Sequence, residues 1–271
     1  TLSGCAYGQT GIDGMLKPPK LSDQQNEIYA ALQASVGKNI TLKYPRTGDF
    51  TSAFLIANID EEQTQEAIVF YENTDTVNVT MNLRINVLDQ TKDGWVSVYD
   101  AGVSAADVDK VNFIQSNGST FLVIGFNLSG NTEKLVVVYR YQDGRLEETA
   151  QRITCLDYVA CNLNKDSYTE LFVISLDVKS GRRMAQAYQI SSQGSARPMG
   201  RTEMDPNVSS YRNIVIGDLA DGRQAVYLDG VSGTNRYTTE ILVYDGGNIQ
   251  NLLYSPTEEL SYIDETARNH A

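Results

Sequence analysis

Four glycines recur at a nearly constant spacing along the chain, and this period constrains the fold more than any other feature. They are Gly94 in QTKDGWV, Gly144 in RYQDGRL, Gly194 in ISSQGSA and Gly246 in VYDGGNI, with spacings of 50, 50 and 52 residues. Each glycine stands between two β-type runs, which is the pattern of a hairpin with a glycine in its turn. A fixed period of this length indicates an array of equivalent supersecondary units.

A second hairpin is predicted upstream of each glycine hairpin. The four segments that carry it are FLIANIDEEQTQEAIVFY (54–71), NFIQSNGSTFLVIGF (112–126), DYVACNLNKDSYTELFVI (157–174) and NIVIGDLADGRQAVYL (213–228). Two hairpins give four antiparallel strands per unit, which is typical of a β-propeller blade. The sequence therefore predicts a mostly β fold with about four blades of about 50 residues. A β-sandwich would explain the alternation of apolar residues but not the fixed period.

One amphipathic helix is expected before the repeats. The segment from Ser22 to Gln25 has the spacing of a capping box, the next apolar residues share one helical face, and Gly37 can end the helix. We find no other convincing helix. The predicted organisation is a tether over residues 1–21, a cap of helix and strand over 22–48, and propeller blades over 49–271, which form an incomplete ring if they do not close.

Composition excludes several classes of function. The 271 residues carry a net charge of −12, which disfavours nucleic acid and anionic membrane surfaces as partners. No run of about 18 apolar residues is present, so no segment is predicted to span a bilayer. The single histidine, His270, leaves almost no room for imidazole catalysis or for zinc held by histidines.

The first residues indicate a cellular address. Leu2-Ser3-Gly4-Cys5 matches the bacterial lipobox, in which the cysteine becomes lipid-modified after cleavage. The following MLKPPK (15–20) favours an extended polyproline geometry and reads as a tether. We therefore expect a protein outside the cytoplasm that is anchored to the cell membrane through lipid on Cys5, because stable anchoring takes more than one acyl chain and lipoproteins carry several.

The repeats resemble the FG-GAP/VCBS-type propeller repeats of integrin-like and bacterial surface proteins. The resemblance rests on an aspartate-rich loop after an apolar strand, then an acidic residue and a second strand, and it covers roughly residues 50–260. No blade keeps a full DxDxDG motif or an FG…GAP pair. The resemblance implies a bacterial surface lipoprotein with degenerate propeller repeats.

Two loops place oxygen-bearing residues at every second position, which is the pattern of a calcium-type loop. The residues are Asn58, Asp60, Glu62, Thr64 and Glu66 in the first unit, and Asn162, Asn164, Asp166, Tyr168 and Glu170 in the third. Calcium takes roughly six to eight oxygen ligands, but neither loop has the usual glycine at its sixth position. Asn and Asp also satisfy turns by themselves, so we favour polar turns over calcium sites. No cofactor is expected.

The sequence indicates binding more than catalysis. It shows no GxSxG motif, P-loop or dinucleotide fingerprint. We expect a non-catalytic binding or scaffolding module at the cell surface, with a glycan or a protein as partner. The alternatives are a carbohydrate-active enzyme with a carboxylate pair on the propeller face, and an adhesion module that docks a protein on its loops. Cys155 and Cys161 are expected to be buried apolar residues.

With four units, the sequence allows three ways of completing the array. The strand NITLKYP (39–45) could complete the last blade, two chains could join their arcs, or the native chain could be longer; we favour the third. In the third case at least one blade edge is expected to be exposed, and the tail SYIDETARNHA is expected to pack poorly.

Overall fold

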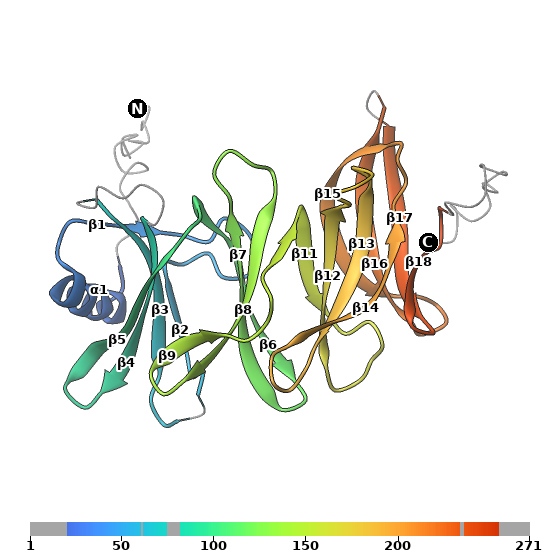
Figure 1. Ribbon diagram of the computed structural model, residues 1–271. Coiled ribbons are helices and arrows are strands. Elements are labelled where there is room, and N and C mark those ends of the chain that lie inside the picture. The colour runs from blue at the N-terminus through green and yellow to red at the C-terminus, as the bar shows by residue number, and fades with distance from the viewer. Residues whose placement is uncertain (1–20, 61, 75–81, 234–235, 255–271) are drawn as a thin grey trace, which may run out of the picture.

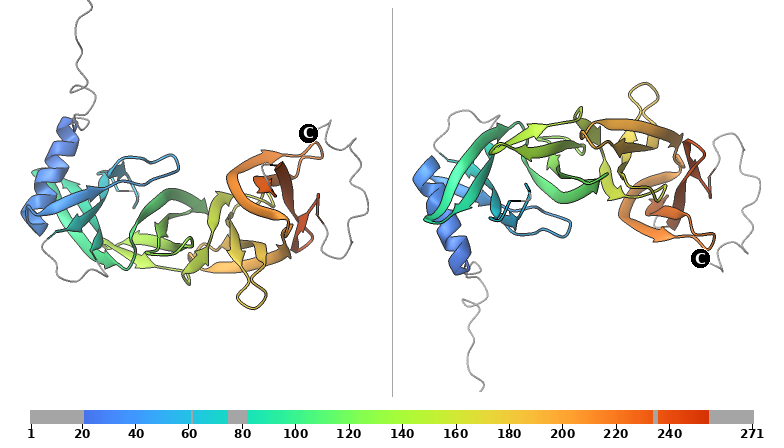
Figure 2. Two further views of the ribbon diagram at one scale, coloured as in Figure 1. Left: turned by 90° about the horizontal axis from the view of Figure 1, so that it is seen from above. Right: turned by 90° about the horizontal axis from the view of Figure 1, so that it is seen from below.

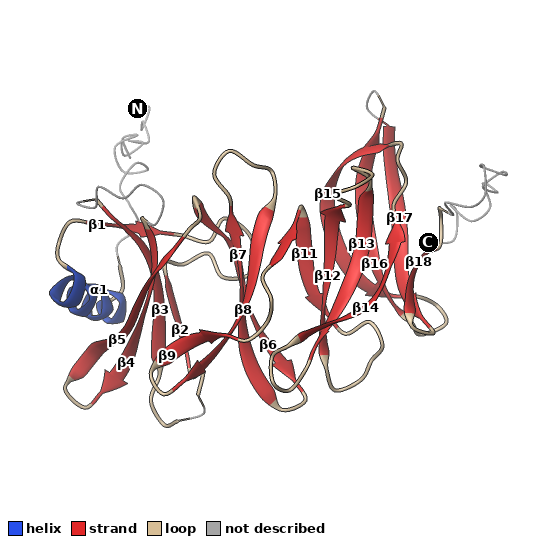
Figure 3. Cartoon of the chain, viewed as in Figure 1, coloured by secondary structure: helices blue, strands red, loops and turns tan. Residues whose placement is uncertain are grey.

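The computed structural model describes residues 21–60, 62–74, 82–233 and 236–254. This part of the chain is mostly β, with one α-helix and eighteen strands in four antiparallel sheets (Figure 3). Its helix is too short and too polar to cross a membrane. Cys5, the tether and the C-terminal tail lie outside the described residues.

The four sheets follow one another along the chain and are called the first to fourth sheet. The helix is α1 (Asp23–Val36). The first sheet contains β1 (Ile40–Lys43), β2 (Phe54–Ala57), β3 (Glu66–Asn73), β4 (Leu83–Thr91) and β5 (Gly94–Val103). The second contains β6 (Asp107–Ser116), β7 (Ser119–Asn127), β8 (Lys134–Gln142), β9 (Arg145–Glu148) and β10 (Ile153–Cys155). The third contains β11 (Asp157–Cys161), β12 (Thr169–Leu176), β13 (Arg183–Ile190) and β14 (Ala196–Glu203). The fourth contains β15 (Val208–Asp218), β16 (Gln224–Ser232), β17 (Arg236–Asp245) and β18 (Asn248–Asn251).

The predicted hairpins are confirmed. The four periodic glycines lie at or next to the turns of β4–β5, β8–β9, β13–β14 and β17–β18. Their φ angles are +119° at Gly94, +73° at Gly144, +84° at Gly194 and +59° at Gly246. Side chains with a Cβ rarely adopt these values, which explains why the same residue recurs once in each unit.

The first and second sheets each contain a fifth strand: the strand over residues 39–45 was predicted, whereas β10 was not. β1 pairs antiparallel with β3 and lies beside β2 on the same edge of the first sheet. β10 pairs with β8 and extends the second sheet in the same way beside β9. The suggestion that residues 39–45 complete the last blade is therefore wrong, because this strand hydrogen-bonds to the first sheet.

Helix α1 begins and ends where the sequence predicts. The Ser22 side chain accepts a hydrogen bond from the Gln25 amide at 3.2 Å, and Gln25 Oε1 accepts one from the Ser22 amide at 3.0 Å, which completes the capping box. Ile28 and Leu32 are fully buried in an apolar cluster with residues of the first sheet that include Trp95. The helix thus covers the outer face of the first sheet.

Neighbouring sheets pack face to face through apolar side chains. Phe126 belongs to the cluster between the first and second sheets, Phe121 to the one between the second and third, and Phe172 to the one between the third and fourth. All three rings are at most 1% exposed. Burying a side chain of this size contributes about 1.5–3 kcal/mol, so these clusters account for much of the cohesion between sheets.

Partly buried ion pairs add to the junction of the second and third sheets. Lys134 Nζ lies 2.9 Å from Asp109 Oδ2 and 3.2 Å from Asp157 Oδ1, and Lys110 Nζ lies 3.0 Å from the same Asp157 oxygen. The Lys110 ammonium also stands 4.5 Å from the ring centroid of Tyr158. The Asp109 side chain is only 5% exposed, and Lys134 is the cation that pairs with it.

The sheets form an open, propeller-like row. α1 and the first sheet lie at one end and the fourth sheet at the other (Figures 1 and 2). The first and fourth sheets do not meet, so the described blades do not close into a ring. The prediction of propeller-type blades is confirmed, and the row has two different ends.

Candidate functional site

The loop that joins β11 to β12 is organised around a buried carboxylate. Glu170 is fully buried, and its Oε2 accepts a hydrogen bond from the Leu163 amide at 2.8 Å. Gln189 Nε2 donates to Glu170 Oε1 at 3.4 Å. Burial raises the pKa of the Glu170 carboxyl to about 7, although these two hydrogen bonds oppose the shift. Glu170 therefore fixes the start of the loop through its hydrogen bond with the Leu163 amide.

The loop that joins β2 to β3 repeats this arrangement. Glu66 is 2% exposed, and its Oε2 accepts a hydrogen bond from the Ile59 amide at 2.7 Å. Burial raises the pKa of Glu66 to about 7, and the charges of Asp60 and Asp89 add to the shift. In each loop the carboxylate binds the amide of the residue seven positions earlier, so the predicted equivalence of the two loops is confirmed.

The remaining polar residues of both loops bind the loops themselves. Asn162 Nδ2 donates to the Asp166 carbonyl at 2.7 Å, as Asn58 Nδ2 does to the carbonyl of Glu62. Asn164 Oδ1 accepts from the Asp166 amide at 3.3 Å, as Asp60 Oδ1 accepts from the amide of Glu62 at 3.2 Å, and Asp166 Oδ1 accepts from the Tyr168 amide at 2.7 Å. These are the Asx-type bonds expected of polar turns.

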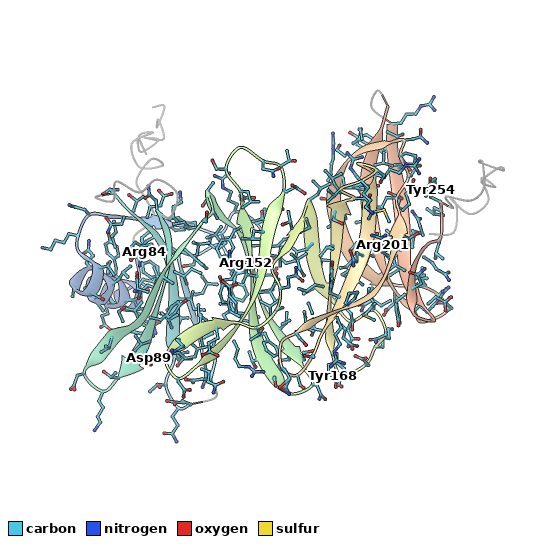
Figure 4. All side chains as sticks on the ribbon, viewed as in Figure 1. Arg84, Asp89, Arg152, Tyr168, Arg201 and Tyr254 are labelled. Carbon is cyan, nitrogen blue, oxygen red and sulfur yellow. The ribbon has the colours of Figure 1, made fainter. Side chains whose placement is uncertain are left out.

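Little in these loops is arranged for a cation. The described residues contain no group of three or more His, Cys, Asp or Glu side chains that could hold a metal ion. Asn162 Oδ1 is a buried oxygen without a hydrogen-bond partner in the described part of the chain. Figure 4 places Tyr168 at the same rim of the row as Asp89 of the first sheet. The described side chains of the two loops do not form a complete calcium site, and the expectation that the fold does not require calcium stays a prediction.

The outer face of the fourth sheet is a second candidate site. The register aligns Val215, Tyr227 and Ile241 in one row across β15, β16 and β17. Their neighbours Val226 and Leu228 point to the other side, where they pack in the cluster with the third sheet. Side chains alternate along a strand, so the Val215–Tyr227–Ile241 row projects away from the third sheet. We call this surface the free face.

A polar row lies beside the apolar row on the free face. Asn213, Asp229 and Thr239 are cross-strand neighbours, and Asp229 accepts hydrogen bonds from Asn213 Nδ2 at 3.3 Å and Thr239 Oγ1 at 3.4 Å. Tyr237 is 74% exposed, and the Arg212 guanidinium stands 5.3 Å from its ring centroid. The free face thus combines apolar, aromatic and charged groups.

A cavity of about 720 Å³ opens at the fourth sheet. Its lining includes Tyr227, Tyr237, Tyr254, Asp229 and Glu240. Tyr254 lies at the end of the row opposite α1 (Figure 4). The size is that of an ordinary ligand site, and the three tyrosines supply flat surfaces with hydrogen-bonding hydroxyls.

Asp229 and Glu240, two of the three carboxylates that line this cavity with Asp205, have different environments. Asp229 projects from the free face, whereas Glu240 stands opposite Leu228 and therefore projects toward the third sheet. Glu240 is 2% exposed and accepts hydrogen bonds from the Asp205 amide at 3.0 Å and from the side chains of Tyr211 and Asn251. Burial raises its pKa. Both oxygens of Glu240 are thus engaged in hydrogen bonds.

The free face was not predicted from the sequence. The alternation in QAVYLDGVS, residues 224–232, was readable as a strand, but no local signal says which of its two faces stays uncovered. Cys155 and Cys161 are free and buried, as predicted. Cys5 lies outside the described residues, so its lipidation stays a prediction.

Comparisons with known proteins do not assign a family. No family model matches the chain, and no curated protein matches it in sequence. Among solved structures, an endo-arabinase from Bacteroides thetaiotaomicron VPI-5482 is 12% identical with a TM-score of 0.36, over 75% of this chain and 78% of that one. A hypothetical protein from Leishmania major is 13% identical with a TM-score of 0.30, over 83% of this chain and 75% of that one. Neither similarity is high enough to transfer a function.

Proposed function

We propose that this protein is a non-catalytic binding and scaffolding module, lipid-anchored outside the cytoplasm, that binds a protein partner through the free face of the fourth sheet. The observation that supports it most is the Val215–Tyr227–Ile241 row. Val215 is 53% exposed, whereas the apolar faces between the other sheets are covered. An apolar, aromatic surface with a polar rim is typical of a protein-binding site.

Cysteine labelling on cells tests this binding. The lipidated chain is expressed with Val215→Cys or, as a control, Val178→Cys, a fully exposed position in the β12–β13 turn. Cys155 and Cys161 are buried, so they add little background. Position 215 is less exposed than position 178 in the isolated chain, so the dilute purified chain sets the reference ratio of labelling rates. We expect a membrane-impermeant maleimide to label position 215, relative to position 178, more slowly on cells than in the purified chain, because a partner covers the free face. An equal ratio in the two conditions would contradict the proposal.

The anchor is tested separately. A fatty-acid analogue fed to the producing bacterium is expected to label the wild-type chain and not Cys5→Ala, because the lipobox LSGC makes this cysteine the acceptor. Equal labelling of both chains would remove the lipid anchor from the proposal without affecting the free face.

A carbohydrate-active enzyme is the second candidate, and the tyrosine-lined cavity with Asp229 favours it. The opposite directions of Asp229 and Glu240 speak against an acid pair, because glycosidases place two carboxylates on either side of one bond. A panel of chromogenic glycosides and polysaccharides tests it. Hydrolysis that disappears in both Asp229→Asn and Glu240→Gln, each still folded, would favour the enzyme over the binding module.

A further inference from the structure

The free face corresponds to a surface that is an interface in the third sheet. There, Val159, Phe172 and Ala187 form a cross-strand row over β11, β12 and β13 and pack in the cluster with the fourth sheet. The Val215–Tyr227–Ile241 row occupies the same strands of the fourth sheet and projects in the same direction along the array. Phe172 is fully buried, whereas Tyr227 at the matching position is partly buried and Val215 is 53% exposed. The next pair on the free face, Ala225 and Val243, is fully buried. The free face is therefore arranged like a face that packs on a neighbouring sheet, but no described sheet packs on it.

The opposite end of the row has no such surface. α1 covers the outer face of the first sheet, where Ile28 and Leu32 are fully buried with Trp95, Leu88 and Val69. The fourth sheet of one molecule cannot pack on the first sheet of another unless α1 leaves. Head-to-tail stacking of copies is thus blocked, and the available counterpart among the described sheets is another free face.

We propose that the free face pairs with the free face of a second copy of this chain about a two-fold axis, so that two four-sheet rows join into one. This inference rests on the proposed function, because it names the protein partner of the same surface. A two-fold interface must be self-complementary. The free face carries Arg212 beside Asp229 and Asn213, so opposite charges and their hydrogen-bond partners are present in each copy.

The size of the surface sets the expected affinity. β16 has nine residues, which gives a sheet face about 30 Å long and, over four strands, about 19 Å wide. The two copies together would bury about 1,100 Å², and interfaces below about 1,200 Å² are typical of weak complexes. We therefore expect a dimer that dissociates in the micromolar range, favoured by the high local concentration of chains anchored in one membrane.

Sedimentation of the purified Cys5→Ser chain tests the pairing. Over concentrations from about 1 µM to about 1 mM, the wild-type surface should shift from monomer to dimer mass. Val215→Lys and Tyr237→Glu, at positions 53% and 74% exposed, should stay monomeric, and the matched control Val178→Lys should dimerise like the wild type. Thermal melts within a few degrees of the wild type establish that each variant is folded.

Three results would overturn the pairing. A chain that stays monomeric over the whole range has no such interface. Dimers that persist in both Val215→Lys and Tyr237→Glu use another surface. Slow maleimide labelling of Val215→Cys in the dilute monomer means that the chain covers its own free face. If the purified chain is monomeric but position 215 is protected on cells, the second copy is excluded while the proposed function stands.

Discussion

Gly125 of β7 and Tyr158 of β11 meet at the junction of the second and third sheets, and the contact leaves no room for a side chain at position 125. A Cβ added to Gly125 would lie 2.6 Å from Tyr158 Cε1 and 2.9 Å from its hydroxyl oxygen. The Tyr158 ring is fully buried, and its hydroxyl donates to the Lys110 carbonyl at 3.3 Å. The glycine is thus required by the approach of a neighbouring sheet and not by a turn.

Gly125→Ala is expected to destabilise the protein. The ring cannot move freely, so overpacking should cost about 1–3 kcal/mol, and the melting temperature should fall by about 2–4 °C per kcal/mol. Differential scanning calorimetry measures the change. The cost should shrink in a Tyr158→Leu background, because the clash is removed there. A cost that is the same in both backgrounds would mean that the ring is not its cause.

The stability of the fold is expected to decrease as the pH rises from about 4.5 to about 7. Glu66 and Glu170 have pKa values raised from 4.5 to about 7 in the folded state, so between these values the folded chain binds more protons than the unfolded chain. Their contribution is fully present below pH 4.5 and is lost as the pH passes through 7. Thermal melts across this window give the slope.

The double variant Glu66→Gln and Glu170→Gln isolates this effect. Glutamine has the same shape and still accepts the amide hydrogen bonds of Ile59 and Leu163. Its melting temperature should vary less with pH between 4.5 and 7 than that of the wild type. The charges of Asp60, Asp89 and Glu62 also raise the pKa of Glu66. An unchanged slope in the double variant would mean that Glu66 and Glu170 do not cause the pH dependence.

The fold is expected not to require calcium. The loop carboxylates hold main-chain amides, so melts with EDTA and with millimolar calcium should nearly coincide. Binding at 100 times the dissociation constant would add about 2.7 kcal/mol to the free energy of unfolding. A rise of several degrees on adding calcium, absent in Asp60→Asn with Asp166→Asn, would establish that the loops bind it.

Lys134→Met is expected to destabilise the junction of the second and third sheets. It leaves the Asp109 carboxylate buried without its cation, which costs about 3 kcal/mol when a buried pair is broken. The matched control is Arg182→Met, which removes an exposed partner of Glu203 and should cost about 1 kcal/mol or less. Urea unfolding of both variants measures the difference. Equal costs would mean that Lys134 is better solvated than its position indicates.

Features that depend on near neighbours in the chain were predictable. The turn glycines, the capping box of Ser22 and Gln25 and the alternation within each strand act over a few residues, so the sequence alone determined the hairpins, α1 and the four units. The equivalence of Glu66 and Glu170 was also readable, because both loops keep the same spacing. Its meaning was not, since a carboxylate at such a position serves a cation or an amide equally well.

Only the tertiary structure decided what each strand and face meets. β1 joins β3 instead of the last sheet, because cross-strand pairing is set by spatial proximity and leaves no trace in a four-residue strand. The burial of Glu170 and the closeness of Gly125 to Tyr158 likewise depend on residues far away in the chain. In the sequence, the Val215–Tyr227–Ile241 row resembles a row that another sheet covers. In the structure, no described sheet packs on this side of the fourth sheet, whereas α1 covers the outer face of the first sheet.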